Sequence, residues 1–419
     1  MKRPLPFYPS RHERTARCGA IVALTLATLA TAAVHPTAIA AESAGGVPRG
    51  TEFSPVALKA GGVFIDPTLT LGAGVNSNIG FASTNPQSSP YASLAPEVVL
   101  TLPYHGQEYE LGLKALAMNY SADSGQNTVD YELAARATNV YGARLNSVWR
   151  IGFAHSHDSA DSSDRSLLSS RPDLWQSEDV QGTLHYGATG ATGNVELELG
   201  AIDKHYTNNR AYTYAADFRA ANADLRYLHR LTAKMQLTAD VRVNRTDYAD
   251  DAAQLDNTDT RWLLGAKWDA TTVTSGSVKF GSESKRFTGR RPGFSGLTWQ
   301  ADVDWRPLSY SSWNLQLDRG AADPTGDTSN FQVETDERLT YVHAWKTYLR
   351  TEFGLSMGRA SFSGTGRVDR LASGSIALLY DFRRTLRLGM SFQDASRNSS
   401  LNIYDYRRQL YSLTAEFSL

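Results

Sequence analysis

The segment Leu297-Thr298-Trp299-Gln300-Ala301-Asp302-Val303-Asp304-Trp305-Arg306 decides the fold class of this chain. Every second residue in it is apolar, and the residues between them are polar or charged. A period of two is typical of a β-strand with one apolar and one polar face. The surrounding region, Gly265 to Leu317, contains four alternating stretches of about 9 to 14 residues, whereas strands of soluble sandwiches have about 5 to 6. A tilted strand that crosses a bilayer needs about 9 to 11 residues, so the lengths favour membrane-spanning strands.

The same alternation begins near Val63 and continues to the C-terminus without an interdomain linker or a long helical pattern. We count about eighteen segments. Tight connections, such as His105-Gly106 and Arg383-Arg384, alternate with long ones, such as Ser77 to Pro90 and Asp158 to Gln176. Outer-membrane barrels have an even number of antiparallel strands, short periplasmic turns and longer outer loops. The sequence therefore predicts an all-β, transmembrane, antiparallel up-and-down β-barrel of about 18 strands with both termini in the periplasm.

The N-terminal region has the layout of an export signal. An Ala-rich apolar run from Ile21 to Val34 follows several basic residues and precedes Ala38-Ile39-Ala40, a small-residue cleavage site. We predict a signal peptide over 1–40, a periplasmic leader segment over 41–62 and the barrel over 63–419, with an uncleaved anchor helix as the alternative. The single cysteine, Cys18, would leave with the signal peptide, so the mature chain would form no disulfide.

Composition argues against a helical membrane protein, because the chain is 41% hydrophobic and has a formal net charge of −1. Its one long apolar run, Ile21 to Val34, has about 14 residues, fewer than the roughly 17–25 of a typical spanning helix. The C-terminal strand places apolar side chains at every second position up to Leu419, a pattern that the barrel-assembly machinery reads. Amphipathic aromatic rings near strand ends would meet the headgroups of outer-membrane lipid and lipopolysaccharide. These aromatic residues are Tyr104, Tyr109, Trp262, Trp268, Trp299, Trp305, Trp313 and Trp345.

Five segments resemble a known family, the putative β-barrel porin type 2 proteins of Gram-negative outer membranes, which are often encoded with exopolysaccharide synthesis and export systems. The segments are Gly74-Val75-Asn76-Ser77-Asn78-Ile79, Tyr206-Thr207-Asn208-Asn209, Gly265 to Pro307, Arg397-Asn398-Ser399-Ser400 and Asp405-Tyr406. The likeness spans almost the entire mature chain, although Asn76 stands where such proteins often carry a Tyr-Asp pair. The resemblance implies an eighteen-stranded barrel that helps polysaccharide cross the outer membrane.

The polar faces of the predicted strands supply candidate lumen residues. Charged side chains are costly against lipid, about 2–4 kcal/mol for a Lys or Arg at the midplane, so we expect them to face the interior. Mixed signs argue against a simple ion filter, and hydroxyls of a polysaccharide could exchange hydrogen bonds with such groups. The alternative is that the side chains merely pair with one another across the barrel. The predicted lumen-lining residues are Arg242, Asn244, Arg261, Lys267, Lys279, Glu283, Gln300, Asp302, Asp304, Arg306, Gln316 and Asp318.

Other chemistry has weaker support. His155, His157 and Asp158, with Asp161 and Asp164, could bind a divalent cation, but their spacing matches no defined site, and a solvated polar loop is the simpler interpretation. No motif singles out a catalytic serine or histidine, and there is no phosphate-binding glycine loop or basic patch for nucleic acid.

We therefore predict a non-enzymatic channel or accessory pore for exopolysaccharide, without a cofactor, supplied by a periplasmic export partner. The alternatives are an uptake porin for small solutes and, less favoured, an outer-membrane adhesin or hydrolase.

Overall fold

A computed structural model describes residues 53–158, 171–269, 273–323 and 329–419, and these residues form strands almost throughout. The strands are β1 Leu58–Ala60, β2 Val63–Asn76, β3 Ser89–Tyr104, β4 Gln107–Tyr120, β5 Thr128–Val140, β6 Leu145–His157, β7 Leu174–Tyr186, β8 Gly193–Tyr206, β9 Phe218–Thr232, β10 Met235–Tyr248, β11 Asn257–Asp269, β12 Thr274–Phe287, β13 Phe294–Leu308, β14 Ser311–Ala322, β15 Gln332–Lys346, β16 Leu349–Phe362, β17 Val368–Arg383, β18 Leu386–Ser399 and β19 Tyr406–Ser418. The helical elements are α2 Arg210–Thr213 and the single 3₁₀ turns Ser124–Gln126, Tyr214–Ala216, Asp251–Ala253 and Asn402–Tyr404.

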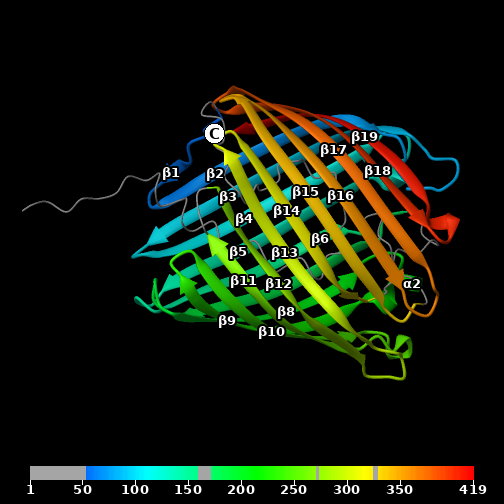
Figure 1. The fold of residues 1–419 in the computed structure, drawn as a ribbon. Helices are drawn as coiled ribbons and strands as arrows, with labels where there is room; N and C mark the ends of the chain where they lie inside the picture. The colour runs from blue at the N-terminus through cyan, green and yellow to red at the C-terminus, as the bar shows by residue number, and fades with distance from the viewer. Residues whose placement is uncertain (1–52, 159–170, 270–272, 324–328) are drawn as a thin grey trace, which may run out of the picture.

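Within these residues the eighteen strands β2 to β19 pair with their neighbours in sequence order, all antiparallel, and β19 pairs with β2 to close the barrel (Figure 1). The prediction of an 18-stranded antiparallel up-and-down barrel is thus confirmed. The closing seam runs from the Leu410–Asn76 pair to the Ser418–Thr68 pair. Side chains reinforce it, because Asn78 Nδ2 donates to the carbonyl of Arg407 at 3.1 Å and Ser418 Oγ donates to the carbonyl of Pro67 at 3.2 Å.

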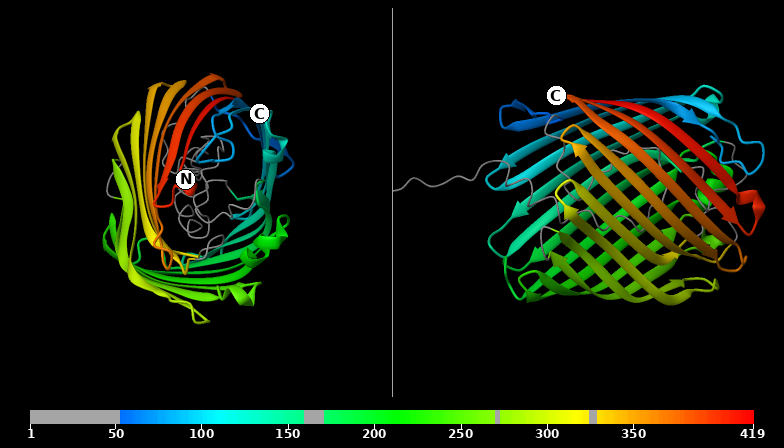
Figure 2. Two further views of the ribbon diagram at one scale, coloured as in Figure 1. Left: turned by 90° about the vertical axis from the view of Figure 1, so that its right-hand side faces the viewer. Right: turned by 45° about the horizontal axis from the view of Figure 1, so that its top comes forward.

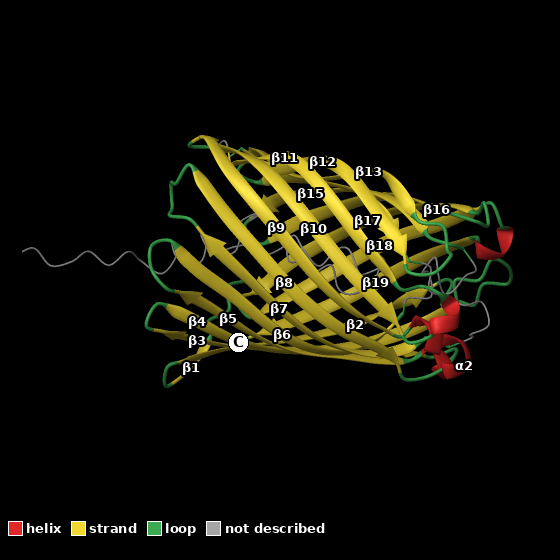
Figure 3. Ribbon diagram, turned by 90° about the horizontal axis from the view of Figure 1, so that it is seen from below, coloured by secondary structure: helices red, strands yellow, loops and turns green. Residues whose placement is uncertain are grey.

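Short and long connections lie at opposite ends of the barrel. The β3–β4 turn consists of His105 and Gly106, which both have positive φ (48° and 82°). Two-residue hairpin turns whose twist matches that of the strands need this backbone conformation. The long connections and α2 gather at the other end (Figure 3). Val63, where β2 begins, and Ser418, where β19 ends, both lie at the short-turn end.

Alternation gives the barrel an apolar outside. Leu264, Phe280 and Leu297 are 70%, 62% and 70% exposed, whereas residues of the opposite parity on the same strands, such as Lys279 and Thr298, are buried. Aromatic rings stack along the outside near the short-turn end in the order Trp305, Trp313, Tyr341 and Phe353, with neighbouring centroids 6.4, 4.2 and 6.1 Å apart. Such an aromatic band is expected where the hydrocarbon meets the headgroups.

The segment before β2 is attached to the barrel. β1 pairs with β2 from Leu58–Ile65 to Ala60–Val63, inside the region predicted as a leader. Phe53 is buried, and the guanidinium of Arg387 lies 4.0 Å from the centre of its ring. The signal peptide predicted over 1–40 lies outside the described residues.

Several strands extend beyond their alternating stretches. β7 begins at Leu174, β16 ends at Phe362 and β18 continues to Ser399. These extensions lie at the long-loop end, where the backbone ladder continues with side chains that no longer alternate between apolar and polar. In the described part of the chain, none of the helices has the length and apolar character needed to cross a membrane.

The closing seam predicts the effect of one substitution. A Cβ at Gly74 would clash with the carbonyl oxygen of Tyr411 in β19 and with the ring of Tyr91, whereas at Gly112 it would meet only Ala134 O, at 3.9 Å. Gly74→Ala should therefore lower the stability of the barrel by about 1–3 kcal/mol, the usual cost of overpacking, while Gly112→Ala should change it little. Urea unfolding followed by heat-modifiable electrophoretic mobility measures both, and equal midpoints would contradict a tight seam.

Candidate lumen surface

The barrel is an oval with a sharp bend between β10 and β14, as the end-on view shows (Figure 2). Contacts between non-adjacent strands mark the bend. Arg242 Nη1 on β10 donates to Gln300 Oε1 on β13 at 3.0 Å, although the two strands would be about 14 Å apart in a flat sheet. Likewise, the backbone N–H of Ala321 on β14 donates to Glu283 Oε1 on β12 at 2.9 Å. The lumen faces of these strands therefore turn toward one another.

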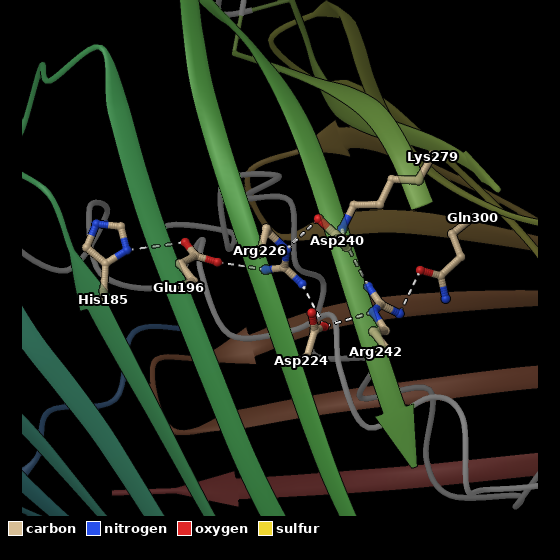
Figure 4. A network of polar contacts seen from close by, with 8 residues as sticks. All are labelled: His185, Glu196, Asp224, Arg226, Asp240, Arg242, Lys279 and Gln300. Atoms are coloured by element: carbon tan, nitrogen blue, oxygen red, sulfur yellow. Dashed lines mark hydrogen bonds and ion pairs between the residues drawn. The ribbon is translucent and has the colours of Figure 1, made fainter. Parts of the chain in front are cut away.

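A network of charges, the charged corner, fills one side of this bend and consists of Glu196, Asp224, Arg226, Asp240, Arg242 and Lys279 (Figure 4). Arg226 binds Glu196 at 2.7 Å and Asp240 at 3.3 Å, and Arg242 binds Asp224 at 2.8 Å. The Nζ of Lys279 pairs with the carboxylate of Asp240.

Burial makes this pairing obligatory. The carboxylate of Asp240 has no exposed surface, and the side chain of Lys279 is 4% exposed. A buried charge is costly unless an opposite charge and hydrogen bonds compensate it, so each member of the corner needs the others. His185, which lies 3.3 Å from Glu196, and Gln300 extend the network at its two ends (Figure 4).

Two smaller clusters continue the bend toward the long-loop end. Arg261 Nη2 pairs with Glu283 Oε1 at 3.0 Å. Lys285 Nζ pairs with Asp323 Oδ1 at 2.5 Å, and Tyr248 donates its hydroxyl to the same carboxylate at 2.9 Å. Asp323, the first residue after β14, is therefore tied to the lumen wall.

At the β14 end of the bend, β13 and β14 carry a carboxylate–amide ladder, which we define as the register pairs Asp304–Asn314, Asp302–Gln316 and Gln300–Asp318. Asn314 Nδ2 donates to Asp302 at 3.0 Å and to Asp304 at 3.1 Å, and Gln300 Nε2 donates to Asp318 at 3.0 Å. In each of these three pairs, a carboxylate on one strand lies opposite an amide on the other strand, and the pairs follow one another along the strands. In the described part of the chain, none of the three carboxylates makes an ion pair.

All twelve predicted lumen residues lie on the strand faces opposite the exposed apolar side chains. Arg242, Arg261, Lys279 and Glu283 form ion pairs with other lumen side chains, and their partners lie one or two strands away along the wall, not across the barrel. The ladder contains Gln300, Asp302, Asp304, Gln316 and Asp318. The other three lie outside both sets: Asn244 donates to Thr246 at 3.3 Å, and Lys267 and Arg306 lie near the short-turn ends of β11 and β13.

The sequence reasoning missed four members of the charged corner, Glu196, Asp224, Arg226 and Asp240. The signal was present, because Asp224 and Arg226 alternate with the exposed Leu225 on β9 just as the predicted residues alternate on β13. The same parity rule, applied to β8, β9 and β10, would have found them.

The connection between β2 and β3, residues 77–88, folds against the lumen face of β19. The ring of Phe81 lies 4.9 Å from that of Tyr406, and the guanidinium of Arg408 lies 4.7 Å from the same Phe81 ring. Tyr406 and Arg408 are both buried and of lumen parity. Asn78, which is fully buried, fixes the loop by exchanging hydrogen bonds with the backbone of Ala82 at 2.9 Å each. This loop therefore narrows the long-loop mouth of the lumen.

Of the cation candidates, His155 stacks on Tyr131, His157 pairs with Asp130 at 2.8 Å, and Asp158 accepts from Tyr206 at 2.6 Å. Asp161 and Asp164 lie outside the described residues. Within the described residues, no group of three or more His, Cys, Asp or Glu side chains is arranged to hold a metal ion.

A closed membrane-type barrel with a polar lumen defines the class of porin-like outer-membrane channels. The model of the family described as putative beta-barrel porin 2 matches residues 51–418, and the chain belongs to that family. This family and this fold are of the channel type. Among curated proteins, none matches the chain.

Three solved structures resemble the barrel at low identity. OpdK of Pseudomonas aeruginosa, solved with vanillate, is 12% identical with a TM-score of 0.49, over 85% of this chain and 99% of that chain. OccK2 (OpdF) of Pseudomonas aeruginosa in complex with glucuronate is 11% identical with a TM-score of 0.49, over 85% and 98%. A bacterial polysaccharide outer membrane secretin is 9% identical with a TM-score of 0.37, over 84% and 98%. Likenesses this distant carry no argument about what this chain transports.

The charged corner predicts a large effect from one isosteric change. Asp240→Asn should destabilise the barrel by about 3–5 kcal/mol, because Arg226, Arg242 and Lys279 would lose their shared carboxylate in a buried site. Asp203→Asn is the control, since its ion pair with Arg219 is exposed and should contribute about 0–1 kcal/mol. Urea unfolding in lipid vesicles, followed by tryptophan fluorescence, compares the two, and similar midpoints would contradict a corner held by paired charges.

The inward loop makes a separate prediction about conductance. Phe81→Ala removes the ring that holds residues 77–88 against β19, so the mouth should widen and single-channel conductance in planar bilayers should rise. Phe280→Ala, on the lipid-facing side of β12, is the control and should leave conductance unchanged. If both variants conduct like the parent, the loop does not limit the pore.

Proposed function

We propose that this porin-family barrel is a channel, or an accessory pore, through which an exopolysaccharide leaves the cell. The observation that carries the proposal is the carboxylate–amide ladder on β13 and β14. Asp302 and Asp304 accept hydrogen bonds from Asn314 and form no ion pair among the described residues, so they keep free acceptor capacity. Asp318 differs from them, because the charges of Arg261 and Arg242 act on its carboxylate.

The chemistry of the ladder suits a polyhydroxylated guest. A sugar hydroxyl both donates and accepts hydrogen bonds, a carboxylate accepts, and an amide does both. Successive pairs of the ladder recur every two residues, about 6.6 Å along the strand. The hydroxyls of a sugar chain that moves along the wall could therefore exchange hydrogen bonds with one pair for hydrogen bonds with the next. Repeated, similar contacts favour movement along the wall over tight binding at a single point.

The proposal includes an orientation. Outer-membrane barrels place their short turns in the periplasm, so we infer that both ends of the chain lie there and that residues 77–88 lie at the cell surface. A periplasmic export partner would then deliver polymer to the end where β1 and Phe53 lie, and the barrel-assembly machinery would recognise β19.

The test combines a strain that lacks this chain with a strain that carries Asp302→Ala, Asp304→Ala and Asp318→Ala together. We expect the deletion to abolish secreted polysaccharide and the triple variant to lower it severalfold while the barrel still folds and conducts ions. The control is Asp203→Ala, an exposed carboxylate at the long-loop end.

Unchanged secreted polymer in the deletion strain would overturn the export role. In that case, uptake of small solutes by purified barrels in vesicles becomes the next measurement. Normal secretion by the triple variant, alongside loss in the deletion strain, would show that the polymer does not use the ladder.

A further inference from the structure

A row of basic side chains crosses the outer surface of the barrel near its long-loop end. The strand register aligns Arg319 on β14 with Thr335 on β15, Thr335 with Arg359 on β16, Arg359 with Arg370 on β17, and Arg370 with Asn398 on β18. The sequence separates these residues by up to about 80 positions, so only the pairing of the strands places them side by side.

These residues point away from the lumen. Arg359 has the same parity on β16 as Leu355 and Met357, which are 56% and 63% exposed, and Arg359 and Arg370 are both exposed. We call Arg319, Thr335, Arg359, Arg370 and Asn398 the outer basic row.

The centre of the row carries uncompensated charge. Arg359 and Arg370 lie directly opposite each other, and like charges in that position destabilise an antiparallel pair. Neither side chain makes an ion pair or a hydrogen bond with the described part of the chain. The nearest outward carboxylate in the register is Glu337, which lies beside Met357 toward the membrane and forms no ion pair with either arginine.

Three other outward arginines at the same end of the barrel are neutralised locally, whereas Arg286 on β12, which is also exposed, forms no ion pair with the described part of the chain. Arg219 pairs with Asp203 at 2.6 Å, Arg245 with Asp247 at 3.1 Å, and Arg407 with Asp394 at 2.7 Å. What distinguishes Arg359 and Arg370 is that two arginines without a carboxylate partner among the described residues lie directly opposite each other on adjacent strands.

The row lies at the level where the apolar band ends. On β17, about twelve residues separate Arg370 from the exposed Phe382 at the short-turn end. At about 3.3 Å per residue and a tilt of about 40°, this is a height of about 30 Å, just beyond an apolar band about 25 Å tall. Met357 and Leu355 lie directly below Arg359 and would contact acyl chains.

We propose that the outer basic row binds the phosphates of lipopolysaccharide in the outer leaflet. Arginine forms bidentate, charge-assisted hydrogen bonds with phosphate, and two arginines on adjacent strands can share one phosphate group. Arg319, held by its hydrogen bond to Thr335 Oγ1 at 2.9 Å, offers a second cationic position two strands away from Arg359. Asn398 can hydrogen-bond the sugar of the headgroup, and the apolar residues below the row accept its acyl chains.

The test measures binding of a fluorescent deep-rough lipopolysaccharide to the purified full-length barrel in detergent. We expect Arg359→Gln combined with Arg370→Gln to weaken binding about tenfold or more, because two charge-assisted contacts to phosphate are lost. Arg219→Gln is the matched control, since it removes an outward arginine at the same end that already has a carboxylate partner, and it should bind like the parent. Heat-modifiable mobility confirms that each variant is folded.

Three results would overturn the proposal. They are equal affinity of the double variant and the parent, equal affinity of the parent for dephosphorylated lipopolysaccharide, and binding to phosphatidylglycerol vesicles as tight as to lipopolysaccharide. The proposal does not depend on the transported molecule, so it stands or falls separately from the export role.

Discussion

The structure depends on one constraint, which is that every backbone N–H and C=O within the hydrocarbon must find a partner inside the protein. A sheet satisfies this constraint only when it has no open edge, and here β19 removes the edge by pairing with β2. The seam is reinforced where the side chains of Asn78 and Ser418 bond to backbone carbonyls across it. In the closed barrel, alternate residues of each strand point outward to lipid, and the residues between them point into the lumen.

The polar side chains that line the lumen have two kinds of partner. Where the barrel bends sharply, strands β10 and β13 approach each other, and ionised groups such as Asp240 and Lys279 become buried and must be paired. On β13 and β14, carboxylates such as Asp302 form no ion pair among the described residues and accept hydrogen bonds from amide side chains. The ion pairs of the charged corner therefore stabilise the fold, while the carboxylate–amide ladder keeps polar groups available for a transported molecule.

Period-two alternation was sufficient to predict the fold and the side of each strand, because side-chain direction in a strand depends only on local sequence. It placed Arg242, Lys279 and Asp302 on the inner face, but it could not give the ion-pair partners of the first two. Arg242 meets Asp224 through the register of β9 and β10, and Lys279 meets Asp240 because the wall bends between β10 and β12. The outer basic row was beyond prediction for a related reason. Arg359 and Arg370 become neighbours only through the register of β16 and β17, which follows from the turn between these strands.

The most direct measurement is cysteine accessibility in the lumen, which the chain permits because it has no cysteine after Cys18. A cysteine at Gln316, in the middle of the carboxylate–amide ladder, should react with a water-soluble maleimide in the purified barrel, and added exopolysaccharide should slow that reaction. A cysteine at Leu297, on the lipid-facing surface, should be unaffected by the polymer. Equal labelling of Gln316→Cys with and without polymer would contradict a lumen through which the polysaccharide passes along the ladder.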